Sequence, residues 1–135
     1  MLHINSPEET ISASPEKVYQ VLTRFFERQP EGIPGFSDWE SFPGGCRFTV
    51  YDQVTCRLTL IEQQPNTHVA YQAEVESPHI TATAGFDIVP KGAESVLLAK
   101  MDADVPFFLQ GMVKGAVNKF MDTAMQYLKK AIENS

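Results

Sequence analysis

The chain has 135 residues, enough for one domain spanning residues 1–135 with a substantial apolar core. Its 11 basic and 17 acidic residues give a net charge of −6, which argues against nonspecific nucleic-acid binding and does not favour an anionic membrane surface. No apolar run reaches the roughly 18 residues that a membrane span needs, and no secretory signal is visible. Two cysteines are too few for a disulfide scaffold. We therefore expect a cytoplasmic protein.

The first predicted elements are a strand and a short helix. Residues 2–11 are interrupted by Pro7, which predicts an edge strand or a bulged one. Ser14-Pro15-Glu16 then has the composition of a helix start, because serine caps free N–H groups, proline suits the first turn and glutamate complements the positive helix end. The helix that follows has one buried face, formed by Val18, Val21, Leu22 and Phe25.

Residues 30–45 are rich in proline and glycine yet contain four large apolar side chains, Ile33, Phe36, Trp39 and Phe42. Proline and glycine break regular structure, whereas aromatic side chains need cover. We expect a loop, a short strand at residues 38–42 and a turn. Two interpretations remain open: the loop is a flap over the mouth of a pocket, or Phe36 and Trp39 plug one end of the core.

Residues 46–60 predict a half-buried hairpin. A three-residue connection at 51–53 places Val50 opposite Val54, Phe48 opposite Cys56, and Cys46 opposite Leu58, with all six on one face. Leu60 continues this inward row, and residues 64–67 form a turn. The two cysteines are diagonal neighbours in this register, which favours two buried thiols over a disulfide.

Three further strands are predicted at residues 68–75, 80–89 and 95–105. Their inward rows are Val69, Tyr71, Ala73 and Val75; Ile80, Ala82, Ala84, Phe86 and Ile88; and Leu97, Ala99, Met101, Ala103 and Val105. Five of these residues are alanine, whereas a core filled by side chains usually alternates large with small ones. Either an internal space remains, or large residues of the helix and loop fill it.

The last predicted element is an amphipathic helix over residues 106–133, with Asp104 as its cap. Its apolar stripe is Leu109, Val113, Ala116, Val117, Phe120, Ala124, Tyr127, Leu128 and Ala131. Phe107, Phe108 and Met112 broaden the stripe at the start, where Gly111 and Gly115 weaken the helix. This end is either a soft entrance to a pocket or a place where glycine lets another element approach closely.

Three segments carry a resemblance to a known superfamily. Residues 11–22 (ISASPEKVYQVL) resemble the opening strand-to-helix segment of the START-like, or SRPBCC, superfamily. Residues 60–65 with 69–71 resemble its mid-sheet turn, and residues 120–132 its last helix. The superfamily includes the birch pollen allergen and polyketide cyclase/dehydrase-like proteins. The middle and end of the chain also show a weaker similarity to one family of carbon monoxide dehydrogenase subunits.

The resemblance implies an α+β helix-grip fold. In this fold a curved antiparallel sheet of six to seven strands wraps around a long C-terminal helix, with two short helices after the first strand. The superfamily hosts carriers, cyclases, co-chaperone domains and ligand sensors, so its fold alone does not give a function.

Few residues offer chemistry. The predicted inward rows contain no Asp or Glu, so we expect no catalytic pair of carboxylates. His, Cys, Asp and Glu never occur at the spacing of metal ligands, so we expect no metal. We also expect no cofactor. Tyr71, on the inward face, and His79, beside a turn, are the acid/base candidates. Each has an alternative role, Tyr71 as a buried tyrosine with a satisfied hydroxyl and His79 as a solvated loop histidine.

We therefore expect a hydrophobic small molecule (a lipid, isoprenoid, quinone or polycyclic compound) as the partner, bound between sheet and helix. The alternatives are a polyketide cyclase/dehydratase-like enzyme that uses Tyr71 and His79, and a protein-interaction domain that uses the loop around Trp39. The sequence leaves the oligomeric state open. The expected lining residues are Trp39, Phe48, Cys56, Leu58, Tyr71, Ala84, Phe86, Ala99, Met101, Phe108, Met112, Ala116 and Phe120.

Overall fold

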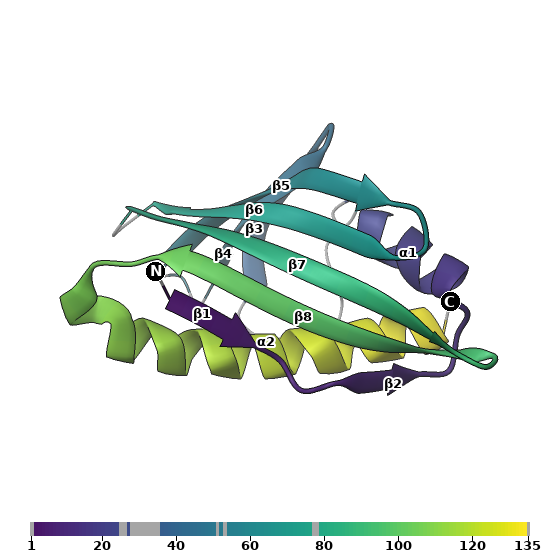
Figure 1. The fold of residues 1–135 in the computed structure, drawn as a ribbon. Coiled ribbons are helices and arrows are strands. Elements are labelled where there is room, and N and C mark those ends of the chain that lie inside the picture. The colour runs from purple at the N-terminus through teal and green to yellow at the C-terminus, as the bar shows by residue number, and fades with distance from the viewer. Residues whose placement is uncertain are drawn as a thin grey trace.

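An eight-stranded antiparallel sheet curves over one long C-terminal helix in the computed structural model of the chain (Figure 1). The structure describes residues 2–24, 27, 36–50, 52, 54–76 and 79–134, apart from the side chains of Phe36, Val50, Ala116 and Phe120. This arrangement is the predicted α+β helix-grip fold. The helix lies along one face of the sheet, and the short helix α1 closes one end (Figure 1).

The strands follow one another in a mostly sequential order, β1-β8-β7-β6-β5-β4-β3, and β2 also pairs with β8. Only the pairing of the first strands with the last one joins distant parts of the chain. The bounds are β1 Leu2–Asn5, β2 Glu9–Ile11, β3 Phe36–Phe42, β4 Gly45–Val50, β5 Val54–Gln64, β6 His68–Glu76, β7 His79–Lys91 and β8 Glu94–Asp104.

The N-terminal run explains why the sheet has eight strands where six to seven were expected. Pro7 has no N–H to donate, and the run divides there into β1 and β2, whose registers on β8 differ by one residue. Ser6 spans the break: its N–H donates to the Ala99 carbonyl (2.8 Å), and its hydroxyl accepts from the Ala99 N–H (3.0 Å). The predicted bulged edge strand is thus confirmed.

The helix α1, Pro15–Arg24, begins as the sequence predicts. The Lys17 N–H donates to the Ser14 hydroxyl oxygen at 3.3 Å, and the Val18 N–H donates to the Ser14 carbonyl at 3.0 Å. Val18 and Leu22 form its buried face. The second short helix that the resemblance implies, the expected buried Phe25 and the expected flap around Ile33 fall on positions outside the described residues.

The hairpin register is confirmed at all three predicted pairs, Val50–Val54, Phe48–Cys56 and Cys46–Leu58. At its first residue the chain needs a glycine. A Cβ on Gly45 would lie 2.1 Å from the Leu58 carbonyl oxygen, so no side chain fits there. β5 continues past Leu60 through a bulge to Gln64, and the predicted turn follows.

The C-terminal helix α2, Gln110–Glu133, is preceded by a single 3₁₀ turn η2, Phe107–Leu109. The predicted Asp104 cap is wrong, because Asp104 still belongs to β8, opposite Thr81, and no side chain caps either helix start. The predicted stripe is correct in direction but shifted by one residue over the second half of the helix. The fully buried residues there are Met121, Met125, Leu128 and Ile132, while Ala124, Tyr127 and Ala131 are half-buried.

The two ends of α2 are held differently. At its C-terminal end, the Ser12 N–H donates to the Glu133 carboxylate at 2.8 Å, and Lys129 lies 3.9 Å from the Glu9 carboxylate. At its N-terminal end, a Cβ on Gly111 or Gly115 would meet no atom within 4 Å. The expectation that these glycines allow close approach of another element is therefore not met.

Candidate functional site

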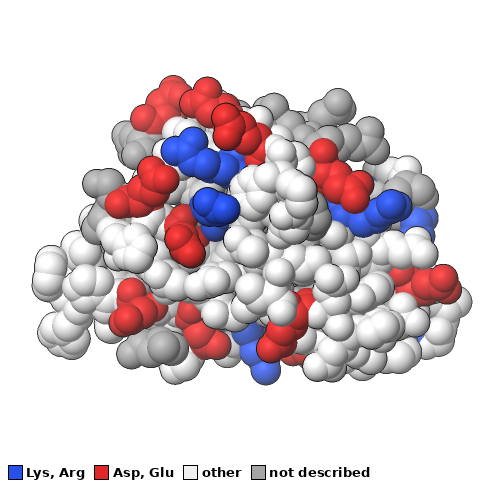
Figure 2. Space-filling model, turned by 90° about the horizontal axis from the view of Figure 1, so that it is seen from above, with Lys and Arg blue, Asp and Glu red and all other residues white. Residues whose placement is uncertain are grey.

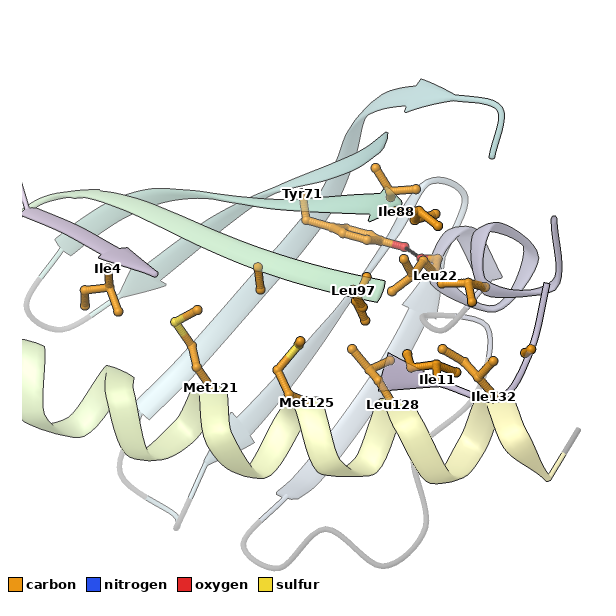
Figure 3. Close-up of a cluster of buried hydrophobic side chains, with 14 residues drawn as sticks. Ile4, Ile11, Leu22, Tyr71, Ile88, Leu97, Met121, Met125, Leu128 and Ile132 are labelled. Carbon is orange, nitrogen blue, oxygen red and sulfur yellow. Dashed lines mark hydrogen bonds between the residues drawn. The ribbon is translucent and has the colours of Figure 1, made fainter. Parts of the chain in front are cut away.

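The inner surface that faces α2 is built from the predicted inward rows of β4 to β8. Figure 3 shows its best-packed part, in which Tyr71, Ile88 and Leu97 of the sheet lie above Met121, Met125 and Leu128 of α2. Side chains alternate between the two faces of β6, β7 and β8, so that the apolar row of each strand faces the helix and the remaining side chains face the other way. The predicted inward faces of these strands are confirmed.

Among the residues whose side chains the structure describes, the buried ones on this surface form two clusters. The first surrounds α1 and the second half of α2, and contains Tyr71 and the residues of Figure 3. The second is small and alanine-rich, with Ala73, Ile80, Ala82, Ala103 and Val105. Among the described side chains of α2 and η2, Leu109 and Val113 pack against this cluster, and both are half-buried.

Three residues pack against both clusters, namely Leu2, Leu58 and Met101, and all three are only half-buried. Leu58 and Met101 belong to the predicted inward rows, so each keeps part of an inward-facing apolar side chain exposed. We call the surface around Leu58 and Met101 the seam. Ala84 lies beside it, paired with Met101 on one side and with Tyr71 on the other.

Tyr71 does not present its hydroxyl as an acid or base. Its side chain is 2% exposed, and its hydroxyl donates to the Leu22 carbonyl at 2.5 Å, near the end of α1 (Figure 3). Burial raises the pKa of this phenol well above its usual range, and the nearby Cys46 and Glu27 raise it further. This geometry supports the alternative prediction of a buried tyrosine with a satisfied hydroxyl.

The two cysteines are free thiols, as predicted. Burial raises the pKa of Cys46 to about 12, helped by the neighbouring Cys56, and burial alone raises the pKa of Cys56 to about 12. A thiol that holds its proton so tightly is a poor nucleophile. Burial therefore disfavours a nucleophilic role for either thiol.

Trp39 of β3 extends the apolar surface to the far edge of the sheet. Its ring stacks on that of Phe48, with centroids 5.3 Å apart and an interplanar angle of 13°. This contact favours the prediction that Trp39 plugs one end of the core. It also places the chain's single tryptophan on the inner surface.

The three histidines lie away from this surface. His79 begins β7 and is exposed, which agrees with a solvated histidine. His3 pairs with Asp102. His68 lies on the outer face of the sheet, with its Nδ1 2.8 Å from Asp87 and its Nε2 3.1 Å from Glu62. Within the described ranges, no group of His, Cys, Asp and Glu could hold a metal ion.

The structure brings most of the expected lining residues together on the inner surface: Trp39, Phe48, Cys56, Leu58, Tyr71, Ala84, Phe86, Ala99 and Met101. Phe108 and Met112 are instead 84% and 69% exposed and do not face the interior. They sit at the start of α2, outside the part that the sheet covers. The side chains of Ala116 and Phe120 fall outside the described residues.

Sequence reasoning missed Met121 and Met125, two buried residues of α2 in the first cluster (Figure 3). Their spacing with Leu128 and Ile132 is 4, 3 and 4 residues, which is that of a helix face. The signal was present, but a second overlapping stripe through Phe120, Ala124 and Tyr127 obscured it.

The comparisons with known proteins agree with this architecture. A family model described as polyketide cyclase / dehydrase and lipid transport matches residues 6–133. The chain belongs to this family. No described helix has the length and hydropathy of a transmembrane span. Among curated proteins no match was found.

Solved structures with the same fold cover nearly the whole chain. A START superfamily protein from Mycobacterium smegmatis is 17% identical with a TM-score of 0.75, over 98% of this chain and 97% of that one. A conserved protein from Geobacillus kaustophilus is 16% identical with a TM-score of 0.78, over 99% and 97%. A norcoclaurine synthase point mutant from Thalictrum, in complex with a transition-state analogue, is 14% identical with a TM-score of 0.72, over 97% and 93%. At these identities the similarity shows the START-like fold.

Proposed function

We propose that the protein binds a hydrophobic small molecule between the inner surface of the sheet and α2. The observation that carries this proposal is the seam, where Leu58 and Met101 face inward and contact both buried clusters yet stay half-buried. Apolar surface of this kind gains free energy when a ligand covers it, at about 25 cal/mol per Å². The ligand proposed is a lipid, isoprenoid, quinone or polycyclic compound.

The chemistry of the surface favours a neutral ligand. Among the described residues Ser95 is the one buried polar residue, and its hydroxyl already donates to the Ala13 carbonyl at 2.8 Å. The inward rows carry no charged side chain. A charged group placed against the seam would lose water without gaining a partner, which is costly. The proposed lining, as far as the structure describes its side chains, is Trp39, Phe48, Cys56, Leu58, Tyr71, Ala84, Phe86, Ala99 and Met101.

The enzymatic alternative has less support from the geometry. The family description includes cyclases and dehydrases, but the two acid/base candidates point in different directions. Tyr71 is inward and bonded to Leu22, whereas His79 is exposed and out of phase with the inward row of β7. His79 also lies five residues along the strand from Ala84, the partner of Tyr71, which is roughly 16 Å. The two residues cannot act on one substrate atom in this arrangement.

A substitution that fills the seam tests the proposal. Ala84→Phe adds a ring beside Met101 on the inner surface, and Thr83→Phe adds the same ring one residue earlier, where Thr83 is exposed on the outer face. Neutral apolar compounds would be screened by thermal shift on wild type and both variants. A ligand at a hundredfold excess over its Kd stabilises the folded state by about 2.7 kcal/mol.

The expected result is a ligand-dependent rise in Tm for wild type and Thr83→Phe, which Ala84→Phe lacks while still unfolding cooperatively. Equal shifts in all three proteins would place the ligand elsewhere. The absence of any shift across lipids, quinones, isoprenoids and polycyclic compounds would contradict the proposal as a whole.

A further inference from the structure

The strongest unexplained feature outside the seam is an exposed apolar group at the start of α2. Phe107 is 88% exposed, Phe108 84% and Met112 69%, whereas the other exposed large hydrophobics among the described residues, Ile61 and Val89, reach only 46% and 45%. Figure 1 shows why: the first turns of α2 project past the end of the sheet. We call Phe107, Phe108 and Met112 the apolar tip.

The tip belongs to a face of the helix that points away from the core. Phe108, Met112 and Lys119 follow one another at spacings of 4 and 7 residues, which places them on one stripe. The residues that α2 turns toward the sheet at this end, Leu109 and Val113, lie on another side. A Cβ on Gly111 or Gly115 would meet no atom of the described residues within 4 Å, so this side of the helix start is open.

The charged residues that flank the tip along the chain include two exposed lysines and two exposed aspartates, Asp104 and Asp122. Between Asp104 and Asp122 the sequence contains Lys114 and Lys119, both exposed, and no carboxylate. Of the two carboxylates just before the tip, Asp102 pairs with His3. In Figure 2 the end of the molecule where α2 begins is uncharged, and acidic groups lie next to it on this face.

The size of the tip helps to identify its partner. Two phenylalanines and a methionine offer roughly 150–250 Å² each, below the roughly 800 Å² per partner that a stable protein interface buries. A few protruding aromatic side chains flanked by lysines are instead sufficient for shallow insertion at a lipid surface, where the lysines meet anionic headgroups.

We propose that the apolar tip docks the protein on the surface of a bilayer that contains anionic lipid. Phe107, Phe108 and Met112 enter the boundary between headgroups and acyl chains, and Lys114 and Lys119 lie at headgroup level. The proposal does not depend on a ligand at the seam, because it rests on a different face of the helix.

Flotation with vesicles tests the proposal. Vesicles of phosphatidylcholine with about 30% phosphatidylglycerol are compared with vesicles of phosphatidylcholine alone. Wild type is expected to float with the anionic vesicles, and Phe107→Ser combined with Phe108→Ser to lower the partition coefficient at least tenfold. Lys114→Gln with Lys119→Gln is expected to remove the preference for anionic vesicles, as is raising the salt to about 0.5 M.

The matched control is Ile61→Ser with Val89→Ser, which removes two exposed hydrophobics from elsewhere and is expected to leave flotation unchanged. The proposal is overturned if wild type does not float, or if the control variant loses binding as strongly as the phenylalanine variant. It is also overturned if sedimentation shows that the phenylalanine variant turns a wild-type dimer into monomers without altering flotation, because the tip then contacts a second copy of the chain.

Discussion

Replacement of Tyr71 by phenylalanine tests how the sheet holds α1. The Tyr71 hydroxyl donates to the Leu22 carbonyl at 2.5 Å, and both residues are buried. Leu22 lies within the last four residues of α1, whose carbonyls lack partners inside the helix. The tyrosine therefore supplies a donor from the sheet to this carbonyl, and the substitution removes the donor while keeping the ring.

The expected cost is that of a buried acceptor left without its partner, about 1–3 kcal/mol of unfolding free energy. Tyr19→Phe is the matched control. Tyr19 is half-buried against the same cluster, and its hydroxyl bonds to no described residue, so its removal is expected to cost less than about 0.5 kcal/mol. Both variants keep the aromatic ring, so the difference between them isolates the hydrogen bond.

Urea unfolding monitored by circular dichroism measures this difference. The expected result is a lower midpoint for Tyr71→Phe with an unchanged m value, because the surface exposed on unfolding is the same. If Tyr71→Phe and Tyr19→Phe unfold at the same urea concentration, the hydrogen bond contributes nothing and the reasoning is refuted. Loss of turnover of some substrate in Tyr71→Phe at unchanged stability would instead revive an acid/base role.

The remaining predictions concern the cysteines and two glycines. Because burial raises the pKa of Cys46 and Cys56 from 9.0 to about 12, both thiols are expected to resist Ellman's reagent at pH 8 in the native protein and to react in denaturant. The same shift means that the folded state holds these protons more tightly than the unfolded state. Stability is therefore expected to fall as pH rises from about 9 toward 12 in urea titrations, and a flat profile would contradict the burial of the thiols. Gly45→Ala is expected to lower the unfolding free energy by more than about 2 kcal/mol, because the new Cβ would lie 2.1 Å from the Leu58 carbonyl oxygen. Gly111→Ala is expected to raise it by about 0.5–1 kcal/mol, because its Cβ meets nothing within 4 Å, and a loss there would show that the helix start is packed against something.

The sheet was largely predictable because its signals are local and periodic. The pairing of Val50 with Val54 follows from a short connection and from the requirement that six apolar side chains share a face. The Ser14 cap and the break at Pro7 follow from the chemistry of single residues. None of these predictions required knowledge of contacts between residues that are distant in the sequence.

The errors arose where a side chain's surroundings depend on distant parts of the chain. The hydrogen bond from Tyr71 to Leu22 joins residues 49 positions apart, and no local pattern indicates it. Phe108 and Met112 were expected to line the pocket, because they broaden the apolar stripe at the start of the helix and were interpreted as a pocket entrance. The helix is instead longer than the surface that covers it, so the same residues are exposed at its projecting end.

The division of the core into two clusters was only partly foreseeable. The alanines at positions 73, 82 and 103 indicated from sequence that the inner surface is lined by small side chains. Whether the helix then fills the remaining space depends on which of its residues point inward, and two overlapping stripes in α2 left that unresolved. Among the side chains that the structure describes, Leu58 and Met101 contact both clusters and remain half-buried.

Fluorescence of Trp39 gives the most direct test of the proposed ligand site, because it is the chain's only tryptophan and stacks on Phe48 at the inner surface. The neutral apolar probe N-phenyl-1-naphthylamine would be titrated into wild type, Thr83→Phe and Ala84→Phe. The account predicts saturable energy transfer from Trp39 to one bound probe in the first two proteins and its loss in Ala84→Phe. No transfer in wild type, or equal transfer in all three proteins, would contradict a ligand site between the sheet and the C-terminal helix.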